Sequence, residues 1–220
     1  MLKKLAMKLK MMAEGQGSFD PSTIGDPLAL HTEWTPARSG GASFRTHKLA
    51  PVSTNRLEFR ASAGAKLFYL LFLLIGVGVL VGFTFAVVAG KGPGLGPGLI
   101  VPFLVGTVFA CLGGGMLYFG TAPIVFDARK GYFWKGKKAP DEVFSKSSIK
   151  HLAKLEEIHA LQLISEYCRS DKSSYYSYEL NLVLKDGTRI NVVDHGNQAK
   201  LREDAATLSE FLDTPIWDAI

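Results

Sequence analysis

The stretch LFYLLFLLIGVGVLVGFTFAVVAG at residues 67–90, followed by LIVPFLVGTVFACLGGGMLYF at residues 99–119, decides the fold of this chain. Neither run carries a charged side chain, and only Lys91 and a glycine- and proline-rich turn at residues 92–98 separate the two. A helix rises about 1.5 Å per residue, so each run is long enough to cross a hydrocarbon core of about 30 Å. The sequence therefore predicts a membrane-spanning hairpin of two helices at residues 67–119.

Basic residues flank both runs and predict the orientation of the hairpin. Three precede the first run and five follow the second, against Lys91 alone in the turn: Arg56, Arg60, Lys66, then Arg129, Lys130, Lys135, Lys137 and Lys138. Lysine and arginine are retained in cytoplasmic loops, so we expect both termini in the cytoplasm. Neither run contains Asp, Glu, Lys, Arg or His, which argues against a channel or transporter because an ion path needs polar groups in the membrane.

The charge of the whole chain is uneven. Lysine and arginine number 25 against 20 acidic residues, a net charge of +5, and the excess lies before the first apolar run. No basic stripe is interleaved with stacking aromatic side chains, so we expect no nucleic-acid partner.

The residues before the first run divide into three parts. Residues 1–14 predict a short basic amphipathic helix, which either lies on anionic headgroups or is solvated, with its charges at Lys3, Lys4, Lys8 and Lys10. Residues 15–42 are rich in Gly, Ser, Pro and Thr and predict a flexible linker, with one extended piece around Leu28 to Trp34. Residues 43–62 alternate apolar and polar side chains about a turn and predict a β-hairpin, which should pack on a sheet contributed from elsewhere.

Residues 123–220 predict a soluble β-rich domain. Strand patterns at Ile124–Asp127 and Tyr132–Trp134 flank a tight turn, and a further strand is expected at Ala160–Tyr167. Leu180, Leu182 and Leu184 alternate with polar residues before an Asp-Gly turn, which indicates a second hairpin up to Val193. A helix capped by Asn197 follows, with its apolar stripe at Leu201, Ala205, Leu208 and Leu212. The fold class is therefore an α+β membrane protein.

The run from Pro123 to Leu212, through its two hairpins and closing helix, resembles the bacterial pleckstrin-homology-like (PH-like) domains found beside paired membrane spans in inner-membrane proteins. The resemblance covers under half of the chain and rests on architecture. It implies a small antiparallel PH-like domain closed by the C-terminal amphipathic helix, located at the bacterial inner membrane. Members of this group have unknown or assembly functions, so it also implies a role in binding.

Small residues recur at a spacing of four within the apolar runs, at Gly78, Gly82, Gly106, Ala110 and Gly114. Such spacing lets helix backbones approach closely. Two interpretations remain open at this point, which are packing of the two spans against each other and association with a second copy of the chain.

Candidate chemistry is sparse. No two of the five histidines have metal-ligand spacing, and the Gly/Pro turn has no dinucleotide-binding pattern. Asp194 and His195 could supply an orienting carboxylate and a base, but adjacent strand residues point to opposite faces. Cys111 and Cys168 predict no disulfide framework. We expect no cofactor, no metal and no enzyme activity.

The sequence thus favours a membrane-anchored scaffolding or assembly factor for another inner-membrane protein, with contacts through strand edges and the hairpin at residues 43–62. Its expected partners are the bilayer and another membrane protein or a second copy of itself. The leading alternative is a sensor of anionic lipid headgroups, through the lysines of residues 1–14 together with Arg129, Lys130, Lys135, Lys137 and Lys138. A remote third class is a membrane hydrolase that would depend on His195.

Overall fold

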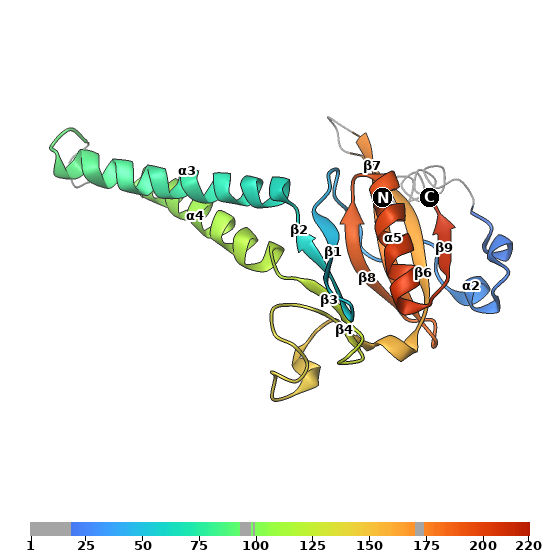
Figure 1. Ribbon diagram of the computed structural model, residues 1–220. Helices are drawn as coiled ribbons and strands as arrows, with labels where there is room; N and C mark the ends of the chain where they lie inside the picture. The colour runs from blue at the N-terminus through green and yellow to red at the C-terminus, as the bar shows by residue number, and fades with distance from the viewer. Residues whose placement is uncertain (1–18, 93–97, 99, 170–173) are drawn as a thin grey trace. The chain divides into compact units, whose positions relative to one another are not determined.

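The computed structural model of the protein describes residues 19–92, 98, 100–169 and 174–220 (Figure 1). The chain divides into two compact units, one of Ala61–Ala122 and one that joins Pro123–Ile220 to the residues before Ala61. The predicted helix at residues 1–14, with its four lysines, lies outside the described residues.

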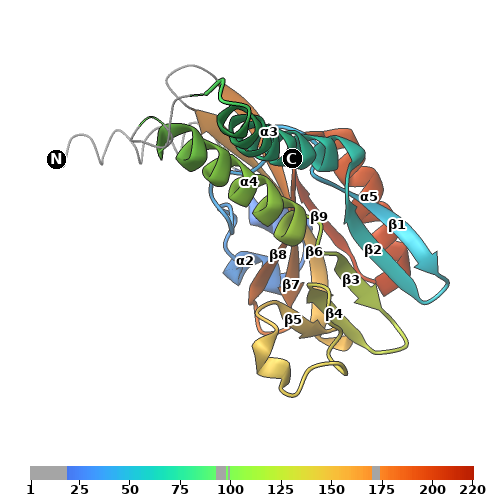
Figure 2. The same ribbon diagram turned by 90° about the vertical axis from the view of Figure 1, so that its left-hand side faces the viewer.

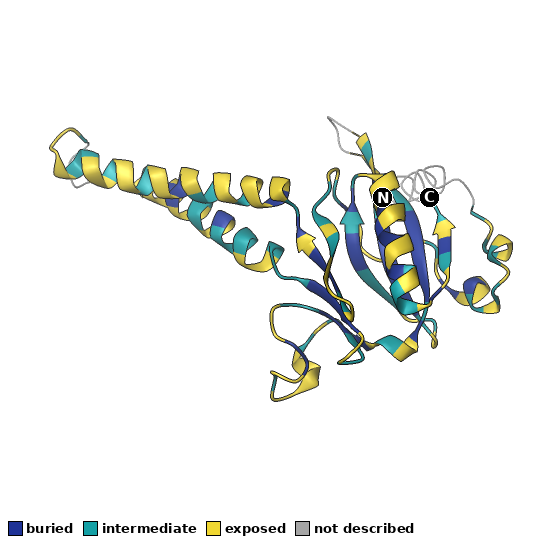
Figure 3. Ribbon diagram, in the orientation of Figure 1, coloured by how far each residue is buried: buried dark blue, intermediate teal, exposed yellow. Residues whose placement is uncertain are grey.

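The first unit is a pair of helices, α3 (Ala63–Val88) and α4 (Ile100–Gly120). Both are long and apolar enough to cross a membrane, and most of their side chains are exposed (Figure 3). α3 begins four residues earlier than the uncharged run because the hydroxyl of Ser62 accepts a hydrogen bond from the main-chain nitrogen of Ala65 and caps the helix.

Glycines set the contact between α3 and α4. A Cβ atom on Gly76 would overlap the main-chain nitrogen of Ala110, and one on Gly113 would overlap that of Leu73. Main chain therefore meets main chain at two levels of the pair, which is the close approach that small residues permit.

The five small residues singled out in the sequence fall into two groups. Ala110 faces Gly76, and a Cβ on Gly106 would lie 2.8 Å from the Leu80 side chain, so these two belong to the helix–helix contact. By contrast, a Cβ on Gly78 or Gly82 would meet no atom within 4 Å, and one on Gly114 only a methyl group of Leu73 at 4.0 Å. The first group supports packing within the pair. In that contact Gly76 of α3 stands in place of Gly78 and Gly82, and Gly113 of α4 stands in place of Gly114.

The second unit contains two sheets. The five-stranded sheet has the order β1-β2-β3-β4-β5, with β1 (His47–Ser53), β2 (Arg56–Ala61), β3 (Ile124–Asp127), β4 (Tyr132–Lys135) and β5 (Leu152–Lys154). The hairpin predicted at residues 43–62 is present as β1 and β2, which are joined by a turn at Thr54 and Asn55. β2 pairs antiparallel with β3, from Arg56 opposite Asp127 to Phe59 opposite Ile124. The hairpin, which precedes the two long helices in the sequence, therefore joins strands that follow them.

The four-stranded sheet has the order β8-β7-β6-β9, with β6 (Ile158–Arg169), β7 (Ser174–Leu184), β8 (Arg189–His195) and β9 (Ile216–Ala219). The hairpin predicted at residues 180–193 is the end of β7 and most of β8. β9 was not predicted, and it runs parallel to β6 while all other pairs in this sheet are antiparallel. Short 3₁₀ turns at Lys146–Ser148 and Leu155–Glu157 connect β4, β5 and β6.

The main core lies between the two sheets and α5 (Gln198–Leu212). Phe59, Phe126 and Phe133 come from the five-stranded sheet, Leu180 and Leu182 from β7, and the predicted stripe of α5 closes the cluster with Leu201, Ala205 and Leu208. The side chain of Asn197 accepts from the main-chain nitrogen of Lys200, as the predicted cap requires. This is a mixed helix-and-sheet unit.

The segment before β1 differs from the expected linker. Its described part forms a 3₁₀ turn at Pro21–Ile24 and helix α2 (Pro27–His31). Helix α2 occupies the first half of the piece around Leu28 to Trp34 that was expected to be extended. Both begin with an Asp-Pro pair in which Asp20 or Asp26 caps the main chain and the proline occupies the first turn, a combination that favours helix starts. Figure 2 shows α2 and α5 on opposite sides of the four-stranded sheet.

Candidate functional site

A row of polar side chains lies on the face of the four-stranded sheet that α5 does not cover. Along β7 the leucines enter the main core, while Ser177, Glu179 and Asn181 point the other way and are nonetheless fully buried. The alternation in the sequence predicts the strand, but it does not reveal that the polar face is covered. Residues 19–41 cover it.

We call residues 33–41 the strap, and its centre rests on Glu179. The two carboxylate oxygens of Glu179 accept hydrogen bonds from the main-chain nitrogens of Ala37 and Arg38, each at 2.8 Å. The side-chain amide of Asn181 donates a third bond at 3.0 Å. Burial raises the pKa of the Glu179 carboxyl, and these three hydrogen bonds act in the opposite direction. The buried carboxylate of Glu179 thus holds the strap through two consecutive main-chain N–H groups.

The C-terminal end of the strap is held in the same way. The carboxylate of Glu166 on β6 accepts from the main-chain nitrogens of Gly40 at 3.1 Å and Gly41 at 3.3 Å. The hydroxyl of Tyr175 donates to the carbonyl of Gly41 at 2.9 Å. A Cβ atom on Gly41 would overlap the Ser177 side chain, so only glycine fits at this crossing.

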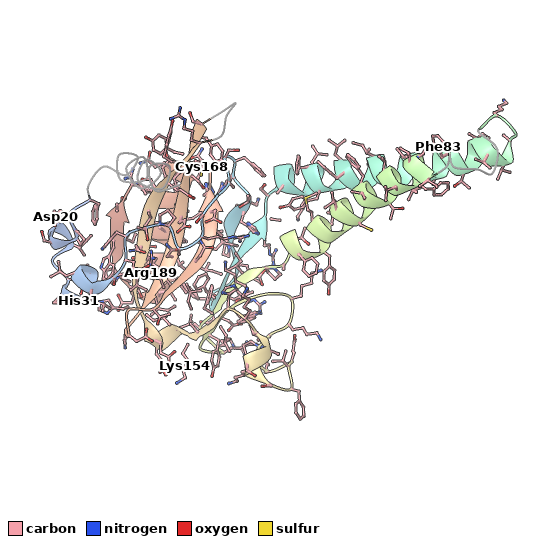
Figure 4. The ribbon with its side chains drawn as sticks, turned by 180° about the vertical axis from the view of Figure 1, so that it is seen from behind. Asp20, His31, Phe83, Lys154, Cys168 and Arg189 are labelled. Atoms are coloured by element: carbon pink, nitrogen blue, oxygen red, sulfur yellow. The ribbon has the colours of Figure 1, made fainter. Side chains whose placement is uncertain are left out.

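The N-terminal end of the strap contacts cationic and amide groups. Arg189, which is labelled in Figure 4, lies on β8. It donates to the carbonyl of Thr35 at 2.7 Å and to the carboxylate of Glu33 at 2.9 Å. Gln162 on β6 donates to the carbonyl of Glu33 at 3.0 Å. The strap face is therefore defined by seven polar side chains, which are Gln162, Glu166, Tyr175, Ser177, Glu179, Asn181 and Arg189.

An apolar contact completes this end. The ring of Trp34 lies 5.9 Å from the buried ring of Trp217 on β9, and its indole nitrogen donates to the carbonyl of Ala29 at 2.9 Å. Asp26 at the start of α2 bonds to His159 at 2.7 Å. β9, which follows Pro215 and pairs with β6, thereby places Trp217 where the ring of Trp34 packs on it.

A second polar cluster lies where β8 faces the end of β4. Lys135 reaches Asn191 at 3.4 Å, and Asn191 donates to the carboxylate of Asp194 at 2.9 Å. Burial lowers the pKa of Lys135 to about 8, and burial together with the charge of Lys135 lowers the pKa of His47 to about 4. Burial raises the pKa of Asp194.

The structure does not bring the five predicted basic residues of the soluble domain onto one surface. Arg129 and Lys130 lie at the β3–β4 turn, where Lys130 pairs with Asp141 at 2.6 Å. Lys135 turns inward to Asn191, and the exposed Lys137 and Lys138 follow the opposite end of β4. A cavity of about 290 Å³ lies beside this turn. Its lining residues are Lys130, Gly131, Tyr132, Lys154 and Glu156.

Asp194 and His195 have different partners. His195 is buried, its Nδ1 accepts from the main-chain nitrogen of Asn197 at 3.1 Å, and burial lowers its pKa to about 4. Among the residues that the structure describes, no group of three or more His, Cys, Asp or Glu side chains is arranged to hold a metal ion. No protein-family description, curated protein or solved structure matches the chain.

Proposed function

We propose that the protein is a membrane-anchored adaptor, whose sheet unit binds an extended segment of another membrane protein without catalysing a reaction. In this proposal α3 and α4 cross the bacterial inner membrane, and both termini lie in the cytoplasm. The basic flanks of the two spans support that orientation.

The sheet unit would be a PH-like domain. Support comes from the two sheets packed around one core, the succession of hairpins and the single C-terminal helix that closes the core. β9 and the strap would be additions to that plan, and both lie at the strap face.

One observation carries the adaptor proposal, and it is the way in which Glu179 and its neighbours hold the strap. Most polar contacts on the strap face end on main-chain groups of the strap, from the carbonyl of Glu33 to that of Gly41. Recognition of main chain by fixed side chains is a means of binding extended polypeptide whatever its exact sequence. A partner segment would take the place of the strap.

Site-specific photocrosslinking in intact cells tests the proposal. A photoreactive residue replaces Thr188, an exposed position beside Arg189 at the rim of the strap face, and the matched control replaces Thr207, an exposed position on α5. The full-length protein is then purified in mild detergent, and its crosslinked products are identified by mass spectrometry.

We expect a membrane protein to be crosslinked from position 188 and not from position 207. Products that contain only lipid or only the protein itself would contradict the adaptor proposal. Equal crosslinking from both positions would contradict the assignment to the strap face.

A further inference from the structure

The strap can leave its face without breaking a sheet. Residues 33–41 form no strand, and they are attached through side chains of the strap face instead of a ladder of main-chain bonds. Just after the strap, the side chain of Arg45 forms a salt bridge with the carboxylate of Asp204 on α5 at 2.8 Å. The main chain of Arg45 also forms an isolated antiparallel β-bridge with His195. Release of the strap would therefore end at Arg45 and leave β1 and the core in place.

The strap also leaves some hydrogen-bonding atoms of its face without a partner. Ser177 Oγ and Asn181 Oδ1 are buried, yet neither has a hydrogen-bond partner among the residues that the structure describes. Leaving a buried polar atom without a partner costs about 1–3 kcal/mol. A segment that offers donors at these two atoms would bind the same face more tightly than the strap does.

Three further contacts depend on the side chains of the strap instead of its main chain. Arg189, whose side chain is 9% exposed, pairs with the carboxylate of Glu33. Trp217 packs on the indole of Trp34, and the Ser177 side chain leaves room only for glycine at position 41. These contacts define what an occupant must carry.

We infer that the strap occupies in cis the site of a partner segment with the same chemistry, namely an acidic residue followed directly by tryptophan, then glycine six and seven residues after that tryptophan. The spacing is that of Glu33, Trp34, Gly40 and Gly41. This inference rests on the proposed adaptor function, and it adds the identity of the bound segment and the competition with the strap.

Competition sets the expected affinities. A tethered segment acts at an effective concentration of the order of millimolar, so the intact protein should bind such a peptide only weakly. The apparent affinity is reduced in proportion to the fraction of molecules whose strap is released. A variant that destabilises only the strap should therefore bind more tightly.

The test uses the full-length protein in detergent micelles and a labelled peptide of the sequence EWTPARSGGA, residues 33–42. Gly41→Val releases the strap by overlap with Ser177, and Ser39→Val, at an exposed strap position, is the matched control. We expect Gly41→Val to bind the peptide at least ten-fold more tightly than the wild type or Ser39→Val. Peptides with alanine for the tryptophan or valine for the second glycine should bind at least ten-fold more weakly.

A second route avoids any folding defect of Gly41→Val. A protease site inserted between Ala42 and Ser43 is cleaved after folding, and the labelled peptide should then exchange into the strap face. Equal binding by wild type and cleaved protein, or equal binding of the altered peptides, would overturn the inference. A dimer of the Gly41→Val variant that excess peptide does not dissociate would identify a second copy of the chain as the occupant and would likewise overturn it.

The two proposals fail separately. A partner crosslinked from position 188 together with no peptide binding would leave the adaptor function standing and remove the inferred segment chemistry. Peptide binding without any crosslinked partner would remove the adaptor function, and with it the partner segment, and would leave only an exchangeable strap.

Discussion

Replacement of Glu179 by glutamine is the most direct perturbation of the strap. Glutamine has nearly the same shape but only one acceptor oxygen, so one of the main-chain nitrogens of Ala37 and Arg38 would face an amide nitrogen. A hydrogen bond to a charged group contributes about 1.5–3 kcal/mol, and the relief of burying a charge offsets part of that loss. We expect a net loss of about 1.5 kcal/mol in strap attachment.

Hydrogen exchange measures this loss, because amides of a local opening exchange in proportion to the opened population. At about 1.4 kcal/mol per factor of ten, the amides of Ala37 and Arg38 should exchange about ten-fold faster in Glu179→Gln than in the wild type. The amides of α5 should not change. Glu210→Gln, on the exposed side of α5, removes the same charge without touching the strap and serves as the control.

Two results would refute the reasoning about Glu179. Unchanged protection of Ala37 and Arg38 would mean that the carboxylate does not hold the strap. Faster exchange in α5 as well would mean that the substitution unfolds the whole unit instead of releasing one segment.

Three further predictions follow from other parts of the structure. Gly76→Val should weaken the α3–α4 contact by about 1–3 kcal/mol, while Gly78→Val, where a Cβ meets nothing, should leave it intact, as measured by crosslinking of engineered cysteine pairs between the helices. Lys135→Met should stabilise the sheet unit by about 2 kcal/mol at pH 7 in tryptophan-monitored unfolding, since a charged lysine is half buried there. That gain should fade as the pH rises from about 8 towards 10.5, because the folded wild type then sheds the proton that the unfolded chain still holds. The free energy of unfolding of the wild type should fall as the pH falls from 6.5 to about 4, because the buried neutral rings of His195 and His47 must then take up protons. His195→Gln should reduce that loss by about 2–3 kcal/mol and leave the contribution of His47. A pH profile of unfolding that is identical in His195→Gln and the wild type would show that His195 is not buried as a neutral ring.

The elements with a strong local pattern were predictable. The long uncharged runs predicted two long apolar helices, and alternation about a turn predicted the hairpins at residues 43–62 and 180–193. Asn197 and the stripe of α5 were readable because a cap and a 3.6-residue period are properties of neighbouring residues. The end of the chain was harder, since four residues from Ile216 carry no period and become a strand only through pairing with β6.

The strap face could not be predicted from the same signals. Glu179 and Asn181 occupy polar positions of an alternating strand, and that pattern is normally read as a solvated face. Their burial depends on a segment about 140 residues away in sequence, whose glycines and proline suggested a linker. One signal was available, because the Asp-Pro pairs at residues 20–21 and 26–27 mark helix starts and so argue for order in this segment.

The composition of the strap face is itself an argument about its use. A face that stayed covered could be apolar, because well-packed apolar side chains are often at least as stabilising as a buried polar network. Glu179, Glu166 and Arg189 instead keep the face soluble when it is uncovered, since each would regain water in place of the strap. Among the described strap residues, Trp34 is the one that packs on an apolar cluster, which lies at one end of the face and consists of Ala29, Ala160, Val183 and Trp217. The rest of the strap is held by polar contacts. Such a surface suits a segment that leaves and returns, as competition between the strap and a partner requires.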